Sequence, residues 1–300
     1  MLAEELLSTE GLDKNRTYII QQKIDGVRAV AYLIKGAVRI IGRHSTTDIS
    51  YRYPEVVADL RKMAESIPEG MELIFDGELC CLLSENSDSF WLNVSFPSIA
   101  SREHTEGTRK IELLSKMLPA TFVIFDILGD NKDLPLSDRL KVLDSVNMDI
   151  RSKELKRIKV IKTIAGNYQN AEKLFEKARQ LELEGIMLKL PLAPYQGRRS
   201  PAWLKLKTYR STEEKIIGYT SKNRAISALI LESGSKVNAV ISTPDEELIL
   251  KEEIAIEKSV GDEKQFYFSK SYLIAEVKYL ERTEEGKLRF PVLKEIRNTT

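Results

Sequence analysis

A short polar segment near the start of the chain, from Lys23 to Arg28, separates two apolar runs. Residues 18–20 precede it and residues 29–34 follow it, both rich in β-branched and aromatic side chains, with an Asp-Gly step between them. This pattern predicts a strand, a turn and a second strand, which would place Lys23 at the end of the first strand. The alternative is a surface hairpin with scattered charges.

Lys23 is a candidate nucleophile because of what surrounds it in the sequence. A free lysine has a pKa of about 10.4 and reacts poorly while it is protonated. Burial or nearby cations lower that pKa, and Arg28 is close in the sequence.

The composition is typical of a soluble globular protein with two domains of ordinary size. The chain has 300 residues, of which 42% are hydrophobic and 30% are charged. No apolar run approaches the roughly 18 residues that a membrane span needs. Residues 1–12 lack the basic leader and apolar core of a signal peptide, so we expect a cytoplasmic protein without a membrane segment.

Charge and cysteine content narrow the candidate functions further. Cys80 and Cys81 are too few for a tetrahedral zinc site and are poorly placed to bridge each other, so we expect reduced thiols. The formal net charge of +1 provides no overall attraction to nucleic acid. Any DNA contact must therefore come from a local basic patch such as residues 196–200.

The first part of the chain mixes helical and strand patterns. We expect an irregular polar segment at residues 84–110 and a domain linker at residues 208–214. The remaining elements expected there are strands at residues 37–43, 71–83, 121–128, 182–189 and 202–207, and helices that start near Tyr53, Leu134 and Asn170.

The last ninety or so residues contain short strand patterns and one helix. The helix opens at Thr243, where a Pro follows and acidic residues fill the first turn. Such a region fits a small five-stranded barrel. The expected strands are residues 215–220, 226–232, 236–242, 272–281 and 287–296.

Four later segments carry side chains suited to phosphate and metal chemistry. Strand alternation places Lys205 and Lys207 on one face, where two cations repel each other unless an anion lies between them. Each segment alone has a simpler interpretation, such as an exposed acid in a turn, a core phenylalanine or a solvated strand edge. The four are Asp76-Gly77-Glu78, Phe122 to Leu128, Glu184 to Lys189, and Trp203 to Lys207.

Taken in order with the first segment, these four resemble the motifs of covalent nucleotidyltransferases, the family of DNA ligases, RNA ligases and mRNA capping enzymes. The first motif of that family, Lys-x-Asp-Gly-x-Arg, corresponds to residues 23–28, and the resemblance covers roughly residues 15–297. It implies that Lys23 attacks the α-phosphate of a nucleotide and then carries the nucleotide as a phosphoramidate.

The resemblance also implies roles for the neighbouring motifs. Glu184 would bind Mg²⁺, a cation that prefers carboxylate oxygen, and Glu78 would contact the ribose or a metal. Phe125 would stack on the purine, and Lys189 would touch phosphate. Asp25 would contact the attacked sugar or a metal in a later step.

The cations implied by the resemblance form one group. Lys205 and Lys207 would be aimed at the α-phosphate, and together with Arg28 and the Mg²⁺ on Glu184 they would stabilise charge during phosphoryl transfer. We expect the same cations to lower the pKa of Lys23.

Other segments resemble ATP-dependent DNA ligases in particular. By this resemblance Arg43 binds nucleotide and grips the DNA backbone, and we place Arg198 and Arg199 on the DNA backbone as well. NAD-dependent ligases are disfavoured, because only 22 residues precede Lys23 and two cysteines cannot supply their four-cysteine zinc module. The segments are Ile41 to Arg43, Leu134 to Arg139, Ala193 to Ser200, Ala275 to Tyr279 and Leu288 to Pro291.

Two positions depart from the family pattern. Arg297, which would orient the pyrophosphate leaving group, is followed by Asn298-Thr299-Thr300 instead of an acidic residue and a lysine. Gln21 stands two residues before Lys23, where glutamate is frequent. An amide can accept from an adenine amino group or donate to a guanine carbonyl, so the base preference stays open.

We therefore predict an α+β protein with an adenylation (nucleotidyltransferase) domain at residues 1–210, built of antiparallel sheets and flanking helices, and an OB-fold barrel at residues 211–300. The expected function is that of a minimal ATP-dependent DNA ligase, which seals 5′-phosphate/3′-hydroxyl nicks in duplex DNA. It would use ATP and Mg²⁺, with Mn²⁺ as a substitute metal.

We expect this ligase to act as a monomer in DNA repair or replication, with a repair or clamp protein as a candidate partner. Three alternatives stay open: an RNA ligase, a capping-type guanylyltransferase, and an inactive nucleic-acid-binding scaffold.

Overall fold

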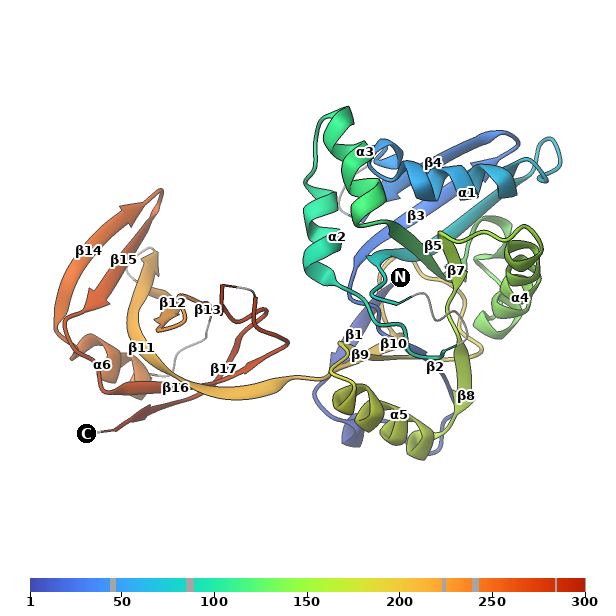
Figure 1. Cartoon of the computed structure of the whole chain (residues 1–300). Coiled ribbons are helices and arrows are strands. Elements are labelled where there is room, and N and C mark those ends of the chain that lie inside the picture. The colour runs from blue at the N-terminus through green and yellow to red at the C-terminus, as the bar shows by residue number, and fades with distance from the viewer. Residues whose placement is uncertain (44–46, 85–88, 223–224, 239–242, 284, 300) are drawn as a thin grey trace. The chain divides into compact units, whose positions relative to one another are not determined.

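The structure is a computed structural model that describes residues 1–43, 47–84, 89–222, 225–238, 243–283 and 285–299 (Figure 1). The chain divides into two compact units, Met1–Lys207 and Thr208–Thr300. Helices and strands are mixed in the first unit and strands dominate the second, so the predicted α+β class is confirmed.

One sheet of the first unit consists of β1 (Leu2–Leu6), β2 (Tyr18–Gln22), β8 (Thr163–Gly166), β9 (Gly185–Lys189) and β10 (Arg199–Lys207). Its strand order is β1-β10-β9-β2-β8, in which β1 runs parallel to β10 and the other neighbours are antiparallel. Helix α5 (Tyr168–Gln180) packs Ala171, Phe175 and Ala178 against Ile20 and Leu188 of this sheet.

The other sheet consists of β3 (Val27–Ile34), β4 (Ala37–Gly42), β5 (Glu72–Cys81), β6 (Ala120–Ile127) and β7 (Ile158–Val160). Its order is β4-β3-β5-β6-β7, and β6 and β7 are the parallel pair. The further helices are α1 (Pro54–Ala64), α2 (Phe96–Glu103), α3 (Thr108–Met117) and α4 (Leu136–Ser152).

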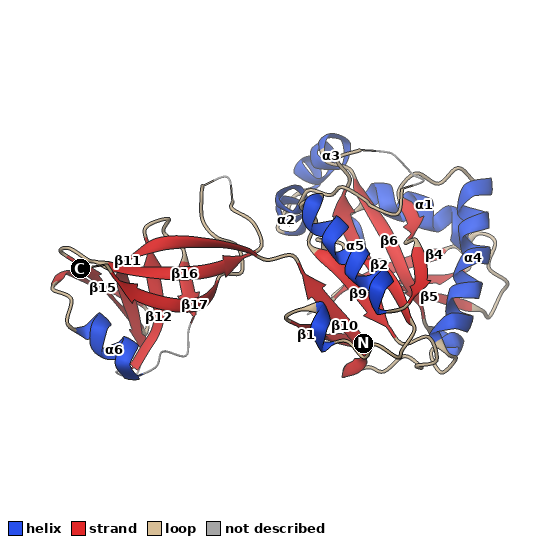
Figure 2. Cartoon of the chain, turned by 90° about the horizontal axis from the view of Figure 1, so that it is seen from below, coloured by secondary structure: helices blue, strands red, loops and turns tan. Residues whose placement is uncertain are grey.

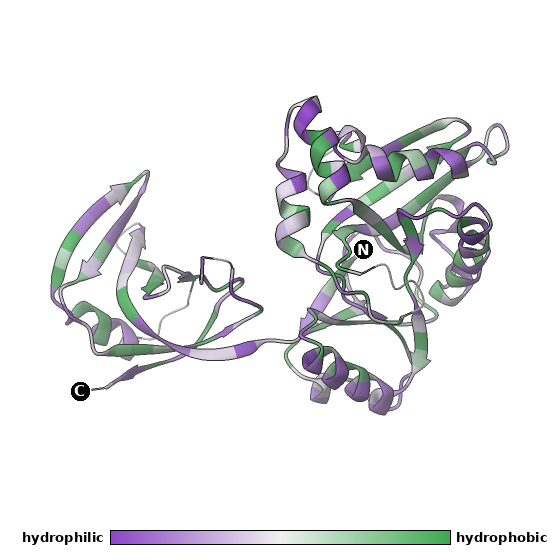
Figure 3. Cartoon of the chain, in the orientation of Figure 1, coloured by the Kyte–Doolittle hydropathy of each residue, from purple (hydrophilic) through white to green (hydrophobic). Residues whose placement is uncertain are grey.

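Apolar faces of these helices close the core of the second sheet. Val56, Leu60 and Met63 of α1, the helix expected to start near Tyr53, pack together with Phe75 and Leu143 in one buried cluster. Figure 2 shows helices lying along the sheets, and Figure 3 shows that strands such as β3 and β5 carry many hydrophobic residues while the helices carry many hydrophilic ones. Short 3₁₀ turns lie at Thr9–Gly11, Ser50–Arg52 and Gly129–Asn131.

The segment around Lys23 connects the two sheets, so the two expected strands form but do not pair with each other as a hairpin. β2 pairs with β8 and β9, whereas β3 pairs with β4 and β5. The chain crosses between the sheets at residues 23–26, and an added Cβ at Gly26 would lie 2.3 Å from the carbonyl oxygen of Leu79. Glycine is required there because the backbone passes so close to β5.

Two other local expectations need correction. Residues 84–110 include α2 and the start of α3 rather than a wholly irregular segment, although residues 85–88 lie outside the described residues. Arg102 of α2 is buried and binds Glu55, which gives a polar segment a reason to be ordered. Helix α5, which we expected to follow Asn170 as its N-cap, begins at Tyr168 and is capped by Asn167. The Asn167 and Asn170 side chains exchange hydrogen bonds with each other's backbone in a capping box.

Within its described residues, the second unit contains seven strands and one helix. They are β11 (Arg210–Lys222), β12 (Ala225–Leu231), β13 (Lys236–Asn238), β14 (Ile254–Val260), β15 (Glu263–Phe268), β16 (Leu273–Tyr279), β17 (Val292–Asn298) and α6 (Thr243–Leu250). β11 pairs with β12, β15 and β16, and β17 completes the sheet beside β16. The core includes Ile216, Leu229, Val237 and Ala275.

Five of these strands overlap the expected ones, but β14 and β15 do not. Every residue of β14 is exposed, although Ile254, Ile256 and Val260 recur at even spacing along the strand. The expected linker at residues 208–214 is largely wrong as well, because Arg210 starts β11 and pairs with Tyr279 of β16. Residues 239–242 of the expected strand 236–242 lie outside the described residues.

The structure also bears on two features considered in the sequence, namely membrane-spanning helices and the two cysteines. Within the described ranges, no helix is long and apolar enough to cross a membrane. Cys80 and Cys81 are both buried and free. Burial raises the pKa of the Cys81 thiol to about 11.

Candidate active site

The site is built around Lys23, which follows the last residue of β2. Its backbone N–H donates to the carbonyl oxygen of Gly185 at 2.9 Å, and its Nζ donates to Glu184 Oε2 at 2.7 Å. Gly185 has a φ of 142°, and an added Cβ would lie 1.9 Å from the carbonyl oxygen of Leu206. Only glycine therefore lets β9 begin this close to β10, with Glu184 directly beside Lys23.

Carboxylates, not cations, dominate the surroundings of Lys23. Burial acts to lower its pKa, but the charges of Glu184, Glu78 and Asp25 outweigh burial, so the pKa of Lys23 is raised. The charges of the chain itself therefore act against the expected lowering of this pKa. Arg28, the cation nearest in sequence, is instead bound to Asp76.

The lysines expected on one strand face share a carboxylate partner. Lys205 and Lys207 lie on β10, and Glu5 lies on the neighbouring strand β1. Glu5 Oε2 is 2.9 Å from Lys205 Nζ and 3.9 Å from Lys207 Nζ. Burial lowers the pKa of Lys207, while Glu5 and Glu184 oppose that shift. Glu5 was not singled out from the sequence.

Two carboxylates near Lys23 are the candidates for a divalent metal. Glu78 lies on β5, next to Arg28 of β3 in the strand register. Burial raises the pKa of Glu78 to about 8, although the Lys23 cation opposes this, and Glu184 adds to the increase. Among the described residues, no group of three or more His, Cys, Asp or Glu side chains could hold a metal alone. A metal here would need ligands from a substrate as well as Glu78 and Glu184.

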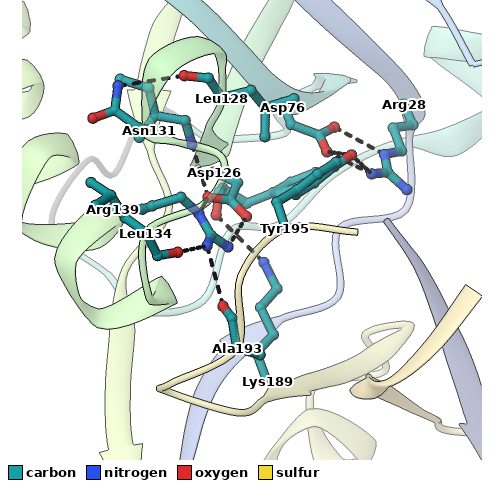
Figure 4. A network of polar contacts seen from close by, with 12 residues as sticks. Arg28, Asp76, Asp126, Leu128, Asn131, Leu134, Arg139, Lys189, Ala193 and Tyr195 are labelled. Carbon is teal, nitrogen blue, oxygen red and sulfur yellow. Dashed lines mark hydrogen bonds and ion pairs between the residues drawn. The ribbon is translucent and has the colours of Figure 1, made fainter. Parts of the chain in front are cut away.

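Arg28 belongs to a second, more buried polar network (Figure 4). Its guanidinium donates twice to the Asp76 carboxylate, at 2.9 and 2.6 Å, and also to the Met1 carbonyl oxygen at 2.6 Å. Tyr195 donates to the same carboxylate at 2.9 Å and accepts from Arg28 at 3.2 Å. The network therefore holds Arg28 at one end of β3.

Asp126 and Arg139 form the centre of this network (Figure 4). Their side chains are 0% exposed, with two contacts at 2.7 and 2.9 Å. Arg139 also donates to the carbonyl oxygens of Leu134 and Ala193, at 2.6 and 3.2 Å. Sequence reasoning missed this pair, although an aspartate inside an otherwise apolar strand was an available signal.

Lys189 does not occupy the expected phosphate-contacting position. It is 1% exposed, and its Nζ lies 3.4 Å from the Phe125 carbonyl oxygen and 3.8 Å from the centroid of a Trp203 ring. Burial lowers the pKa of Lys189 to about 7, against the opposing charges of Asp126 and Asp76. Its amine points into the buried network of Figure 4, away from solvent.

Phe125 and Gln21 are the candidate contacts for a nucleotide base. The Phe125 ring is half-buried and meets Trp203 edge to face, with 5.9 Å between the ring centroids. Gln21 is 1% exposed, and its Nε2 has no hydrogen-bond partner among the described residues. The next residue, Gln22, exchanges two hydrogen bonds with the backbone of Leu92. A buried amide nitrogen without a partner is suited to donating to a ligand.

The candidate DNA-binding arginines are exposed on the first unit. The backbone N–H of Arg43, in the turn after β4, donates to the Arg28 carbonyl oxygen at 3.1 Å. Arg199 donates to the Ala3 carbonyl oxygen at 2.5 Å, and Arg198 lies 3.4 Å from a side-chain oxygen of Gln196.

Arg297 belongs to β17 in the second unit. Its guanidinium pairs with Glu213 and Glu276 at 3.0 Å each and with Glu295 at 2.9 Å. All of these partners come from the second unit and most are exposed.

Comparisons with known proteins show which family the first unit matches. Residues 1–207 match the family described as ATP dependent DNA ligase domain. Over 282 residues the chain is 26% identical to the SPbeta prophage-derived DNA ligase-like protein LigB of Bacillus subtilis (strain 168), covering 92% of each chain. It is 32% identical over 225 residues to DNA ligase 2 of Korarchaeum cryptofilum, covering 72% of this chain and 35% of that protein.

The chain thus spans nearly all of the first relative but only 35% to 53% of the next three curated relatives. A solved structure from a study of Lig E DNA ligases, described as binding DNA with a minimal scaffold, aligns with a TM-score of 0.63 at 16% identity. The alignment covers 99% of this chain and 100% of that one. Structural neighbours consist of nucleotidyltransferase and OB-fold domains, which confirms that predicted pair of folds.

Proposed function

The chain belongs to the ATP-dependent DNA ligase domain family, and we propose that it seals nicks in duplex DNA through a lysyl-AMP intermediate on Lys23. The observation that carries this proposal is the position of the Lys23 amine. It lies 2.7 Å from Oε2 of Glu184. Glu184 directly precedes β9, a strand that pairs with both β2 and β10. The nucleophile, a carboxylate and a pair of lysines thus come from three adjacent strands.

In the first step, a bond forms between Lys23 Nζ and the α-phosphorus of ATP, and the bond to the pyrophosphate oxygen breaks. A lysine ammonium must lose a proton before its nitrogen can attack, and Glu184 Oε2 is within hydrogen-bond distance to accept that proton. Lys205 and Lys207 would stabilise the negative charge of the transferred phosphate.

The carboxylates of Glu78 and Glu184 fit a magnesium ion. Mg²⁺ commonly binds one or two carboxylates together with substrate phosphates. A nearby divalent cation would favour ionisation of Glu78, whose pKa of about 8 reflects burial without enough positive charge. When bound, the metal would neutralise phosphate charge, and Mn²⁺, which accepts similar ligands, is the expected substitute.

We assign the recognition of the nucleoside to residues between the two sheets. Phe125 would stack on the purine, Gln21 would contact the edge of the base through its buried amide, and Asp25 would contact the sugar or a metal. Arg28 and Arg43 would both contact the nucleotide. The Arg28 guanidinium, which is held in a fixed position, lies 5.5 Å from the Phe125 ring centroid and would support that ring.

In the later steps, AMP passes from Lys23 to the 5′-phosphate of the nick, and the 3′-hydroxyl displaces AMP to join the strands. Arg43, Arg198 and Arg199 are the proposed contacts to the DNA backbone, where cations position the duplex without reading its sequence. Arg297 would orient pyrophosphate in the first step. Its exposed carboxylate partners could be exchanged for phosphate oxygens.

We further propose that residues 1–210 act as the adenylation domain and residues 211–300 as the OB-fold domain, which the division into two compact units supports. The protein would act as a monomer in DNA repair or replication, with a repair or clamp protein as a candidate partner. The two free thiols fit the reducing cytoplasm.

Incubation with α-labelled ATP or GTP in Mg²⁺, followed by addition of nicked duplex DNA or nicked RNA, tests this function. We expect label on the protein from ATP and its release as AMP when nicked DNA is sealed. Label from GTP alone would support a guanylyltransferase, and sealing of RNA alone would support an RNA ligase. A protein that acquires no label from either nucleotide would contradict the proposal.

A further inference from the structure

The parallel strand β1 places a carboxylate between the two lysines of β10. Glu5 and Lys205 are partners in the strand register, and the next pair is Leu6 with Leu206. One carboxylate oxygen of Glu5 contacts Lys205 at 2.9 Å and lies 3.9 Å from Lys207. A single oxygen atom thus serves both cations.

The Glu5 oxygen places a negative charge near both lysines, as an oxygen of a bound phosphate would. Two lysines on one strand face repel each other unless an anion lies near both, and Glu5 provides that anion from within the chain. The side chain of Glu5 is 30% exposed and that of Lys205 is 23% exposed, so solvent and solutes can reach the contact. Ion pairs that are partly exposed in this way are weak enough to be exchanged.

We propose that Glu5 is an internal competitor of nucleotide phosphate, which holds Lys205 and Lys207 until a nucleotide binds and returns to them when AMP leaves. This inference rests on the proposed function, since it is the nucleotide phosphate that uses the two lysines. A carboxylate near an oxyanion also repels it, so Glu5 opposes phosphate binding by competition and by charge. The consequence is weaker retention of both ATP and product AMP.

The position of β1 does not depend on the Glu5 side chain. β1 has a backbone ladder with β10, Leu6 packs against an apolar cluster that includes Leu206, and Arg199 donates to the Ala3 carbonyl oxygen. Replacing the Glu5 carboxylate with an amide of the same size should therefore leave the strand in place. The change isolates the charge of residue 5.

Glu4 offers a matched control on the same strand. Successive side chains of a strand point to opposite faces, so Glu4 is directed away from the face that carries Glu5. Glu4→Gln and Glu5→Gln remove the same charge and keep the same side-chain size. Any difference between the two variants therefore reports the contact with Lys205 and Lys207.

The experiment measures the Kd of α,β-methylene-ATP with Mg²⁺ by calorimetry, together with inhibition by AMP, for the wild type and both variants. We expect Glu5→Gln to bind the analogue about fivefold more tightly, from the energy typical of a partly exposed ion pair. AMP should inhibit this variant more strongly, while Glu4→Gln behaves like the wild type. In a Lys205→Met background, the gain from Glu5→Gln should be largely lost.

Unchanged or weaker binding by Glu5→Gln, in a protein whose wild type binds the analogue and acquires label from ATP, would overturn the role of Glu5 alone. Equal tightening by Glu4→Gln would also overturn it, because the effect would then be one of general charge. A wild type that neither binds the analogue nor acquires label would overturn the proposed function, and the role of Glu5 with it.

Discussion

The two polar clusters of the first unit use the same kinds of side chain in different ways. Around Lys23, each cation meets a carboxylate through one oxygen: Lys23 with Glu184 at 2.7 Å, and Lys205 with Glu5 at 2.9 Å. In the buried network, Asp126 accepts two hydrogen bonds from Arg139, and both side chains are 0% exposed. Bidentate, buried pairs are rigid, whereas single contacts near solvent can be exchanged for a ligand.

Each cluster includes a residue at one end of β9, and the two clusters shift the pKa of a lysine in opposite directions. Glu184, directly before β9, helps to raise the pKa of Lys23, whereas Lys189 at its end has a pKa lowered by burial to about 7. If pKa alone selected the nucleophile, Lys189 would be the better candidate. Access favours Lys23 as the proposed nucleophile, since the Lys189 amine is enclosed by Phe125, Trp203 and the buried network.

The largest expected effect is on covalent labelling when Lys23 is replaced. Lys23→Arg keeps a cation beside Glu184 but cannot supply a neutral amine, because arginine stays protonated in proteins. We expect no protein-bound label from α-labelled ATP with this variant or with Lys23→Ala. Label that persists in both variants would move the nucleophile to another residue.

The next largest effect concerns the buried network around Asp126 and Arg139. Arg139→Met leaves the buried Asp126 carboxylate without its partner, so we expect a loss of about 3–5 kcal/mol in the free energy of unfolding. Lys141→Met, on the same helix, breaks an exposed pair with Asp138 and should cost at most about 0.5 kcal/mol. Urea unfolding compares the two variants. Similar losses would show that the buried pair has no special role.

Sequence reasoning identified the residues around Lys23 better than those of the buried network around Asp126 and Arg139. Lys23, Glu184, Lys205 and Lys207 come together as expected, because each lies in a short motif whose local pattern sets its strand position. The expected direction of the Lys23 pKa shift was wrong, since the shift depends on Glu184 and Glu78 from two distant segments as well as on the neighbouring Asp25.

The buried network depends on contacts between distant residues, and local sequence patterns do not predict which residues pair. Arg139 meets Asp126 across 13 positions of the sequence, and Tyr195 meets Asp76 across 119. The crossing between sheets at residues 23–26 is likewise set by which strands pair, and an Asp-Gly step alone suggests a hairpin. β14, whose residues are all exposed, was also missed.

A smaller effect should appear in the pH dependence of stability. Between about pH 7 and 10.5, the buried Lys189 is largely neutral in the folded state but protonated in the unfolded state, so stability should rise with pH. Asp126, Asp76, Arg28 and Arg139 are the charged groups facing it. The free energy of unfolding of the wild type should gain on the order of 2 kcal/mol relative to Lys189→Met between pH 7 and 9. Parallel curves for the two proteins would contradict the neutral lysine.

The smallest expected effect is on DNA binding. Each phosphate contact contributes about 0.9 to the slope of log affinity against log salt, so Arg43→Ala and Arg198→Ala should each flatten that slope by about this amount. Arg61→Ala, an exposed arginine on α1, removes the same charge and should leave the slope unchanged. Fluorescence anisotropy with a nicked duplex measures it. Equal changes for all three variants would indicate a general charge effect.

The central claim is that access and strand position, rather than a low pKa, make Lys23 the nucleophile. Mass-spectrometric peptide mapping of the wild-type protein after incubation with ATP and Mg²⁺ tests it most directly. The account predicts one AMP adduct, on the peptide that contains Lys23, with the peptide containing Lys189 unmodified. An adduct on Lys189 or on any other residue, with Lys23 unmodified, would contradict it.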